Sequence, residues 1–319
     1  MRMNGQSVAV FDIGSARIKL TVGTSERGAV SFRGMSRDVA LLSGDDTDRL
    51  EAFREALTSL RAAAVDSGCN YVIAAGTEAM RAQGPDSEYY SAALQIIGQL
   101  CIIAPVDEAR LFFEAVNLMG SLSPKSVLVD VGGGSVQAIW GSARSQMGTA
   151  AIGTFAIERK FQGIEKEAPV FGTKQFVDMM EYIDVALRGF VPAELSADTL
   201  VVGSNTMADF FASAATVACV PFEVHALGSA LVSDDFHSLA MKIWGTEYRT
   251  AGRFFSENPR FMFGADKLLM VIHCLQELLK PNTIIGTNMS MSKGAALIAI
   301  REPYRLKEFG LERIPLIPR

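Results

Sequence analysis

The sequence contains one short pattern twice, and this repeat limits the fold more than any other feature. Phe11–Ser15 reads FDIGS and Val129–Ser135 reads VDVGGGS. In both places an apolar, strand-like run ends in an aspartate, one apolar residue and a glycine turn, and a second apolar run follows. Asp12 and Asp130 lie about 120 positions apart, roughly the length of one domain. We therefore interpret the chain as an internal duplication: two related lobes, each presenting a glycine turn from its first hairpin, that face one another across a cleft.

Short apolar runs and helix-like segments alternate along the chain, which predicts α/β lobes with largely parallel or mixed sheets covered by helices. Besides the hairpins, the predicted strands are residues 71–75, 101–104, 199–203 and 283–286, and the predicted helices are residues 47–65, 88–100, 107–119, 174–187, 207–215, 234–243, 265–279 and 290–300. The segment Ser121–Lys125 is typical of a domain joint. We expect one lobe over residues 1–122 and a second over residues 123–319.

The composition is that of a globular protein with a sizeable core. Of the 319 residues, 49% are hydrophobic and 20% are charged, and the formal net charge is −5. These values exclude a disordered chain, a collagen-like repeat and a coiled coil. They also give no general attraction to nucleic acid or membrane surfaces, so we expect neither as a partner. A polyanionic ligand would have to be held by local features of the chain.

The cysteines and the apolar segments favour a cytoplasmic protein. Four single cysteines without a CxxC pair indicate a reduced chain with buried thiols. The N-terminal segment lacks the apolar core and small cleavage residues of a signal peptide. The uncharged run Tyr89–Val106 contains serine, glutamines and a proline, which are costly in lipid. A helix followed by a buried strand explains this run better than a membrane span.

Both glycine turns are candidate phosphate sites. A glycine-rich turn leaves backbone N–H groups unpaired and allows close approach of a ligand, while the preceding aspartate can hold Mg²⁺ over the same phosphate. The alternative is a tight hairpin with a capping aspartate, which we favour for the first turn taken alone. Three consecutive glycines at Gly132–Gly134 are harder to explain structurally. Because the pattern occurs twice, one domain apart, a divided phosphate site is the better interpretation.

Three further segments follow predicted strands directly. Glu108, beside Asp107, can point into a cleft at the carboxyl edge of a sheet, although acidic residues in a first helical turn also simply complement the helix dipole. Arg81 can donate to phosphate oxygens, or lie on the surface and pair with Glu78. Gly203–Thr206 opens a helix whose N–H groups can accept an anion, with simple capping by a side chain as the equal alternative.

Together these segments resemble the exopolyphosphatase and guanosine pentaphosphate phosphohydrolase (Ppx/GppA) family, which belongs to the superfamily of actin, sugar kinases and the heat-shock ATPase. The similarity runs over almost the whole chain, in matching order and spacing. The most specific segments are VLVDVGGGSVQAIWG and DEARLFFEAV, and the weaker ones are FDIGSARIKL, AAGTEAMR, VVGSNT and SKGAAL.

The resemblance implies a fold and an activity. The expected fold is α/β, with two related actin-like or ribonuclease H-like lobes, each a mixed five-stranded sheet with helices, around an interlobe cleft. The last helix, about residues 290–305, would pack back on the first lobe, and the chain would be a short form without the C-terminal helical domain of long members. The implied reaction is hydrolysis of a terminal phosphoanhydride in inorganic polyphosphate or guanosine pentaphosphate. A homodimer is compatible with this interpretation.

The resemblance also assigns roles to residues of this chain. Glu108 aligns with the carboxylate that orients and deprotonates the attacking water. The implied Mg²⁺ would be bound by Asp12, Asp130 and Gln137. The implied phosphate-binding residues are Gly14, Ser15, Arg81, Gly132, Gly133, Gly134, Ser135, Gly203, Ser204, Asn205 and Thr206.

The chain departs from the family pattern in both turns. Gln137 replaces a glutamate and carries no charge, so metal affinity should fall. The first turn has Ala16 and Arg17 where the family has asparagine and serine. A second hypothesis is therefore a polyphosphate-binding or (p)ppGpp-binding regulatory protein with weakened catalysis. A sugar or acid kinase of the same superfamily ranks lower, because the acidic residue lies where the phosphatases have it.

Overall fold

The computed structural model describes residues 6–15, 17–39, 46–120, 122–141, 146–161 and 171–317. The chain forms two compact units. Unit 1 comprises Met1–Ala115 together with Ser290–Arg319, and unit 2 comprises Val116–Met289. The last residues of the chain, from Ser290 onward, therefore belong to unit 1. The two lobes expected from the sequence, residues 1–122 and 123–319, stay a prediction.

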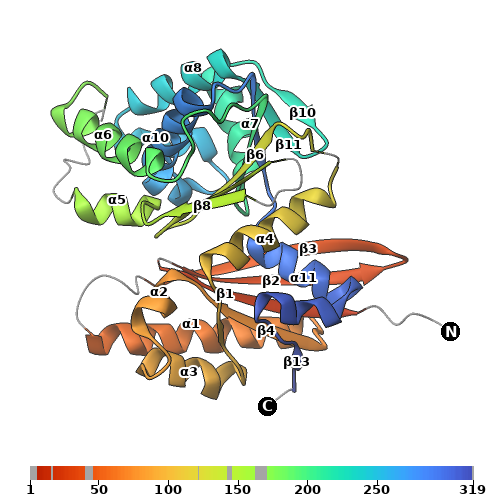
Figure 1. The fold of residues 1–319 in the computed structure, drawn as a ribbon. Coiled ribbons are helices and arrows are strands. Elements are labelled where there is room, and N and C mark those ends of the chain that lie inside the picture. The colour runs from red at the N-terminus through yellow and green to blue at the C-terminus, as the bar shows by residue number, and fades with distance from the viewer. Residues whose placement is uncertain are drawn as a thin grey trace. The chain divides into compact units, whose positions relative to one another are not determined.

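Unit 1 is built on a mixed sheet with the strand order β13-β4-β1-β2-β3, in which β5 also pairs with β4 (Figure 1). Its strands are β1 (Ser7–Ile13), β2 (Arg17–Glu26), β3 (Ala29–Asp38), β4 (Tyr71–Gly76), β5 (Cys101–Ile102) and β13 (Ile314–Pro315). Its helices are α1 (Asp46–Asp66), α2 (Glu78–Gln83), α3 (Glu88–Ile97), α4 (Pro105–Asn117), which runs into unit 2, α11 (Met291–Arg301) and the 3-10 helix η3 (Pro303–Phe309).

Strand β1 lies at the centre of the unit 1 core because all seven of its residues are buried. Ala9, Phe11 and Ile13 pack into a cluster with apolar residues of α1 and α3. Val8 and Val10 point to the opposite face and pack with residues of α11 and η3. This alternation is the two-residue period of a strand whose two faces are both covered, and it explains the unbroken apolar run in the sequence.

Unit 2 contains a second mixed sheet with the order β10-β11-β12-β9-β6-β7-β8. Its strands are β6 (Ser126–Val131), β7 (Val136–Trp140), β8 (Gln146–Ala150), β9 (Thr199–Gly203), β10 (Glu223–His225), β11 (Gly228–Val232) and β12 (Thr283–Thr287). Its helices are α5 (Thr154–Lys160), α6 (Lys174–Arg188), α7 (Met207–Ala218), α8 (Ser233–Trp244), α9 (Tyr248–Ala251), α10 (Met262–Leu279) and the 3-10 helices η1 (Gly252–Phe255) and η2 (Pro259–Phe261).

The two sheets share one arrangement of five strands, which supports the internal duplication. The order β3-β2-β1-β4-β5 in unit 1 matches β8-β7-β6-β9-β12 in unit 2, with the same parallel and antiparallel pairings. We expected five strands in each sheet, and this number was too low. Over the described residues the sheets hold six and seven strands, because β13 joins unit 1 and the β10–β11 hairpin joins unit 2.

The structure describes the environment of the cysteines and of the uncharged run. Burial raises the pKa of Cys69 to about 11 and that of Cys274 to about 12, so these two thiols are unreactive at neutral pH. Cys219, which we expected to be buried, is exposed at the end of α7. In the part of the chain that the structure describes, no helix has the length and apolarity needed to cross a bilayer. The uncharged run forms α3, β5 and the start of α4 instead.

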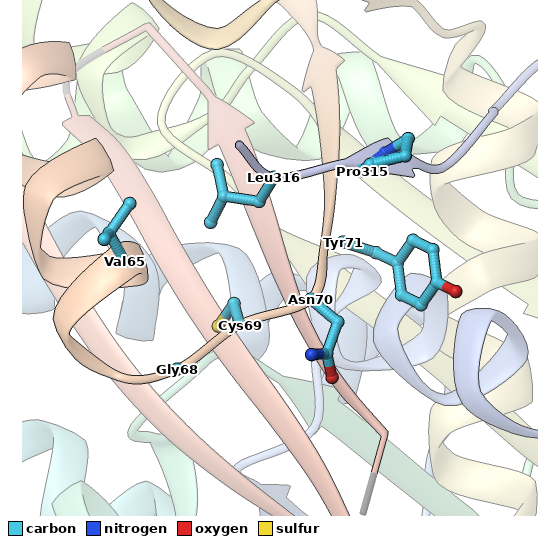
Figure 2. A pocket seen from close by; sticks show the side chains of 7 residues that line it. All are labelled: Val65, Gly68, Cys69, Asn70, Tyr71, Pro315 and Leu316. Carbon is cyan, nitrogen blue, oxygen red and sulfur yellow. The ribbon is translucent and has the colours of Figure 1, made fainter. Parts of the chain in front are cut away.

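A shallow pocket in unit 1 lies where α1 ends, β4 begins and β13 pairs with β4 (Figure 2). Its polar side chain, Asn70, accepts hydrogen bonds from the backbone N–H and the hydroxyl of Ser7. The hydrogen bonds of Asn70 therefore link β1 to the amino end of β4 beside this pocket. The candidate site residues follow the carboxyl end of the same strand.

Helix α11 approaches α4 so closely that only glycine fits at the contact. A Cβ atom on Gly294 would lie within covalent-bond range of the Leu111 carbonyl oxygen. We therefore expect Gly294→Ala to lower the free energy of unfolding by at least about 2 kcal/mol, measured by urea denaturation. Gly34→Ala is the control, because a Cβ there meets no atom within 4 Å and the backbone has no positive φ. Equal stability of the two variants would contradict this packing.

Candidate functional site

Three parallel strands of unit 1 bring the predicted site residues to one edge of the sheet. Strand β1 pairs with β4 so that Ile13 lies opposite Gly76, and β4 pairs with β5 so that Gly76 lies opposite Ile102. Asp12 is the second-last residue of β1 and Ser15 lies in the turn after it, whereas Arg81 lies in α2 after β4 and Glu108 lies in α4 after β5. Because parallel strands end at the same edge, the chain collects these side chains at the place where α/β sheets bind ligands.

Arg81 and Glu108 form an ion pair at this edge. The Nη1 atom of Arg81 lies 2.5 Å from Oε1 of Glu108 and also donates to the Ile103 carbonyl at 2.7 Å. The Glu108 side chain is only 10% exposed and that of Arg81 is 24% exposed, so water screens the pair weakly. The simpler interpretation, a surface arginine paired with Glu78, is wrong. Arg81 therefore holds the Glu108 carboxylate in one orientation, and its own side chain is not fully buried.

Asp12 is buried and has a cation beside it. Lys19 lies directly opposite Asp12 in the β1–β2 hairpin, and its Nζ is 3.4 Å from the Asp12 carboxylate. At the turn itself, the N–H of Gly14 donates to the Arg17 carbonyl at 3.0 Å. The buried Ser15 hydroxyl lies 3.5 Å from a Glu78 carboxylate oxygen. The first turn is therefore a closed hairpin with its aspartate already paired to a lysine.

The second turn, between β6 and β7, is closed by the equivalent backbone hydrogen bond but packs against the start of helix α5. The N–H of Gly132 donates to the Ser135 carbonyl at 2.9 Å. The turn carbonyls accept from the start of α5: Gly132 from Thr154, Gly133 from Phe155 and Ala156, and Gly134 from Gly153. A Cβ on Gly153 would lie 2.4 Å from the Gly133 backbone, so this close approach requires glycine.

Because the carbonyls are occupied by α5, the amide side of the second turn remains available for a ligand. Over the described residues, the N–H groups of Gly133, Gly134 and Ser135 have no hydrogen-bond acceptor. Unpaired amides in a half-buried turn are costly unless a ligand or water accepts from them. Successive amides of this kind form a concave anion-binding nest. The geometry therefore suits a phosphate oxygen.

Gln137 occupies the position opposite Asp130 that Lys19 occupies opposite Asp12. Its side chain is buried, and Nε2 donates to the Ser135 hydroxyl oxygen at 2.6 Å. Since the Ser135 oxygen accepts this bond, its own proton can be donated to an anion. At the two equivalent positions the chain thus places a cation in unit 1 and a neutral amide in unit 2.

The third predicted loop, Gly203–Thr206, follows β9 and precedes α7. Ser204 donates its N–H to the Thr287 carbonyl, and its hydroxyl accepts from the N–H of Thr206 at 3.3 Å. The N–H groups of Ala208 and Asp209 at the start of α7 both donate to the side-chain oxygen of Asn288. Asn288 therefore already satisfies part of this helix end, and the phosphate-binding role of residues 203–206 stays a prediction.

The structure thus places each predicted residue within its own unit. Asp12, Gly14, Ser15, Arg81 and Glu108 belong to unit 1, and the other predicted residues belong to unit 2. The convergence of Asp12 and Asp130 on one phosphate stays a prediction. Sequence reasoning missed Lys19 and Asn288. The hairpin pattern contained a signal for Lys19, because a closed turn places it opposite Asp12. No sequence signal pointed to Asn288, which lies far along the chain from the helix it caps.

Comparison with known proteins decides the family. Residues 15–188, more than half of the chain, match the model of the Ppx/GppA phosphatase family. The chain belongs to this family. An exopolyphosphatase from Cytophaga hutchinsonii has a similar structure, with a TM-score of 0.75 and 18% identity over 92% of this chain and 98% of that one. The Aquifex aeolicus member of the Ppx/GppA family gives a TM-score of 0.72 and 20% identity over 95% and 99% of the two chains. No curated protein sequence matches the chain.

These similarities establish the fold class predicted from the sequence. The chain has the two-lobe, actin-like fold of the Ppx/GppA phosphatases, with a mixed sheet in each lobe. The matched residues include the second glycine turn and the Arg81–Glu108 pair. At identities of 20% or below, the likeness to the solved structures concerns the fold. The chemistry of this chain must be argued from its own residues.

The cap that Asn288 provides for α7 is open to a direct test. We expect Asn288→Ala to lower the free energy of unfolding by about 1 kcal/mol, because two N–H groups lose their acceptor. Asn288→Asp should keep the stability of the unchanged protein, since a carboxylate accepts the same bonds and complements the helix dipole. Thermal unfolding of both variants measures the difference. An alanine variant as stable as the aspartate variant would show that the cap contributes nothing.

Proposed function

We propose that the protein is a phosphoanhydride hydrolase that releases terminal phosphate from inorganic polyphosphate or guanosine pentaphosphate. The observation that carries this proposal is the Arg81–Glu108 pair, in which a buried carboxylate contacts an arginine whose side chain is 24% exposed, at the carboxyl edge of three parallel strands. Membership in a phosphatase family supports the same reaction class. Inorganic polyphosphate is the first substrate to test, because the similar Cytophaga protein is an exopolyphosphatase.

In this proposal Glu108 acts on the attacking water. Phosphoryl transfer needs an oriented nucleophile and compensation of negative charge more than it needs covalent chemistry. A carboxylate that is held in one orientation by Arg81 can accept a hydrogen bond from water and then its proton. The other N–H groups of the Arg81 guanidinium would donate to the phosphate that is attacked, because a guanidinium matches the oxygen geometry of phosphate. Arg81 therefore both orients the base and neutralises charge.

The glycine turn of unit 2 would hold phosphate groups of the substrate. Over the described residues the N–H groups of Gly133, Gly134 and Ser135 have no acceptor, and the Ser135 hydroxyl is left to donate because its oxygen accepts from Gln137. Four donors close together bind phosphate oxygens without a basic surface. This agrees with a chain whose formal net charge is −5.

The available ligands fit Mg²⁺ only in combination with phosphate oxygens. Asp130 offers a carboxylate, and Gln137 keeps its side-chain carbonyl oxygen after Nε2 has bonded to Ser135. Over the described residues, no three of the types His, Cys, Asp and Glu gather to hold a metal by themselves. Mg²⁺ commonly takes one or two carboxylates, water and substrate phosphates, so this set suits it. The ion would supply charge compensation on the phosphates. Asp12 is the weaker candidate ligand, because Lys19 already offsets its charge.

The neutral Gln137 favours a second candidate function. With an amide where a carboxylate would bind the metal more strongly, the chain can bind polyphosphate or a guanosine polyphosphate and turn it over slowly or not at all. Calorimetric binding of these compounds without phosphate release would support this binding or regulatory function. Efficient phosphate release would exclude it.

Glu108→Gln tests the proposed hydrolase. The amide keeps the size of the side chain but cannot take a proton, so we expect the rate of phosphate release to fall by about 10²–10⁴-fold. The assay measures phosphate released from polyphosphate and from guanosine pentaphosphate, with and without Mg²⁺.

Glu114→Gln is the matched control for this assay. It lies on the same helix and makes the same chemical change, and its partner Arg305 retains ion pairs with Glu302 and Glu308. The control should keep the activity of the unchanged protein. Phosphate release that is equal in the Glu108→Gln variant and the unchanged protein, or absent from both, would overturn the proposed mechanism.

A further inference from the structure

The seven-residue helix α5 is the direct support of the second glycine turn. Four N–H groups at its start, from Gly153 to Ala156, donate to the three glycine carbonyls at 2.7–3.0 Å. These bonds fix which way the peptide planes of the turn face, and hence where the free amides of Gly133 and Gly134 point. A helix this short has little stability of its own, so its position depends on packing.

Helix α10 holds α5 through two contacts on one of its faces. Gly264 lies against Thr154, where an added Cβ would be 3.5 Å from the threonine side chain. One turn further along α10, the Nζ of Lys267 lies 2.5 Å from a carboxylate oxygen of Glu158. Positions 264 and 267 are neighbours on one helix face, as are positions 154 and 158. The two helices therefore lie side by side along these faces, and the ion pair is the direct side-chain contact between them.

Lys267 is an unusual residue for this place because it is 3% exposed. Its Nζ also lies 2.9 Å from the Asp266 carboxylate. Burial opposes the charged form of Lys267, but the carboxylates of Asp266 and Glu158 outweigh it and raise the pKa of the ammonium group. An apolar side chain would fill the same space without the cost of removing charges from water. Core stability alone therefore does not account for a lysine here.

The two carboxylates act differently on the lysine. Asp266 is the neighbour of Lys267 on α10, so this contact does not depend on α5. Glu158 belongs to α5, and its side chain is 31% exposed. The Lys267–Glu158 bond is thus the ionic contact that crosses between the helices. Because the two charged groups are in direct contact, this ion pair ties the position of α5 to that of α10.

We propose that Lys267, acting through Glu158, is a positioning residue for the second glycine turn, because it fixes α5 and thereby the direction of the turn amides that bind phosphate. The ligand part of this inference rests on the proposed function, whereas the positioning part concerns the free protein. Loss of the Lys267–Glu158 bond should loosen α5 and the turn and weaken phosphate binding. It should leave the rest of unit 2 folded, since the core around α10 is unchanged.

The test compares Glu158→Gln with Asp178→Asn in the full chain. Both variants convert a carboxylate that is ion-paired with a lysine into an amide, but Asp178 pairs with Lys174 on the exposed side of α6. Amide hydrogen exchange of the free proteins is measured over residues 128–161. We expect exchange in Glu158→Gln to be about tenfold faster over the turn and α5, and unchanged in Asp178→Asn. Thermal midpoints should agree within about 3 °C, which separates loosening from unfolding.

Lys267→Met and the double variant with Glu158→Gln show whether the two residues act as one unit. If Lys267 acts through Glu158, the double variant should exchange no faster over the turn than Lys267→Met alone. Should Lys267→Met fail to fold, the exchange comparison of the two amide variants still decides. Equal exchange over the turn in Glu158→Gln and Asp178→Asn would overturn the inference.

Binding of inorganic tripolyphosphate, measured by calorimetry, separates this inference from the proposed function. We expect affinity to fall about tenfold in Glu158→Gln, with kcat for phosphate release changed less than KM. If the unchanged protein neither binds tripolyphosphate nor releases phosphate, the proposed function fails, while the exchange data still decide the positioning role. If it binds equally well in both variants despite faster exchange, the link between positioning and affinity is wrong.

Discussion

The parallel pairing between the central strands of each sheet is the constraint on which the rest of the structure depends. In unit 1 the register places Asp12 opposite Ala75, so that the first turn and the segment containing Arg81 leave the sheet side by side. In unit 2 the same pairing places Asp130 opposite Gly203. A slip of one residue would turn every side chain of a strand to the other face. Because the two faces of β1 pack into two different clusters, such a slip would place each set of side chains in the wrong cluster, and the core thereby fixes the edge where the candidate site residues lie.

Within this frame the two turns have diverged. Both close with the same hydrogen bond, from the glycine N–H to the carbonyl three residues later. The residues opposite the two aspartates differ, however. Lys19 lies opposite Asp12, and Gln137 lies opposite Asp130. The first turn therefore pairs its own carboxylate internally. In the second turn Gln137 lies opposite Asp130, and over the described residues the N–H groups of Gly133, Gly134 and Ser135 have no acceptor, which suits a phosphate ligand.

The sequence predicted those parts of the fold that a local pattern determines. The buried hairpins and the long helices were found because their apolar residues repeat at strand or helix spacing. Strand β3 was missed because it is an edge strand in which no residue is fully buried, so its apolar residues are few and the pattern is weak. Helix α5 was missed because seven residues show no helical period. Its existence depends on contacts with the glycine turn and with α10, which the local sequence does not reveal.

The same distinction applies to the site. The types of residue that phosphate chemistry needs were predicted, whereas their partners were not, because partners come from distant parts of the chain. Arg81 was read as a possible partner of Glu78, yet it bonds to Glu108 on another helix. Asn288 caps a helix that begins about 80 positions earlier, and Lys267 contacts a carboxylate about 110 positions earlier. At such separations only the tertiary structure decides which side chains meet.

The most direct test of the account is nuclear magnetic resonance of the glycine-¹⁵N-labelled protein titrated with inorganic tripolyphosphate. The account predicts that the amide signals of Gly133 and Gly134 shift first and most strongly. Unchanged signals at both glycines, with binding detected elsewhere, would contradict it.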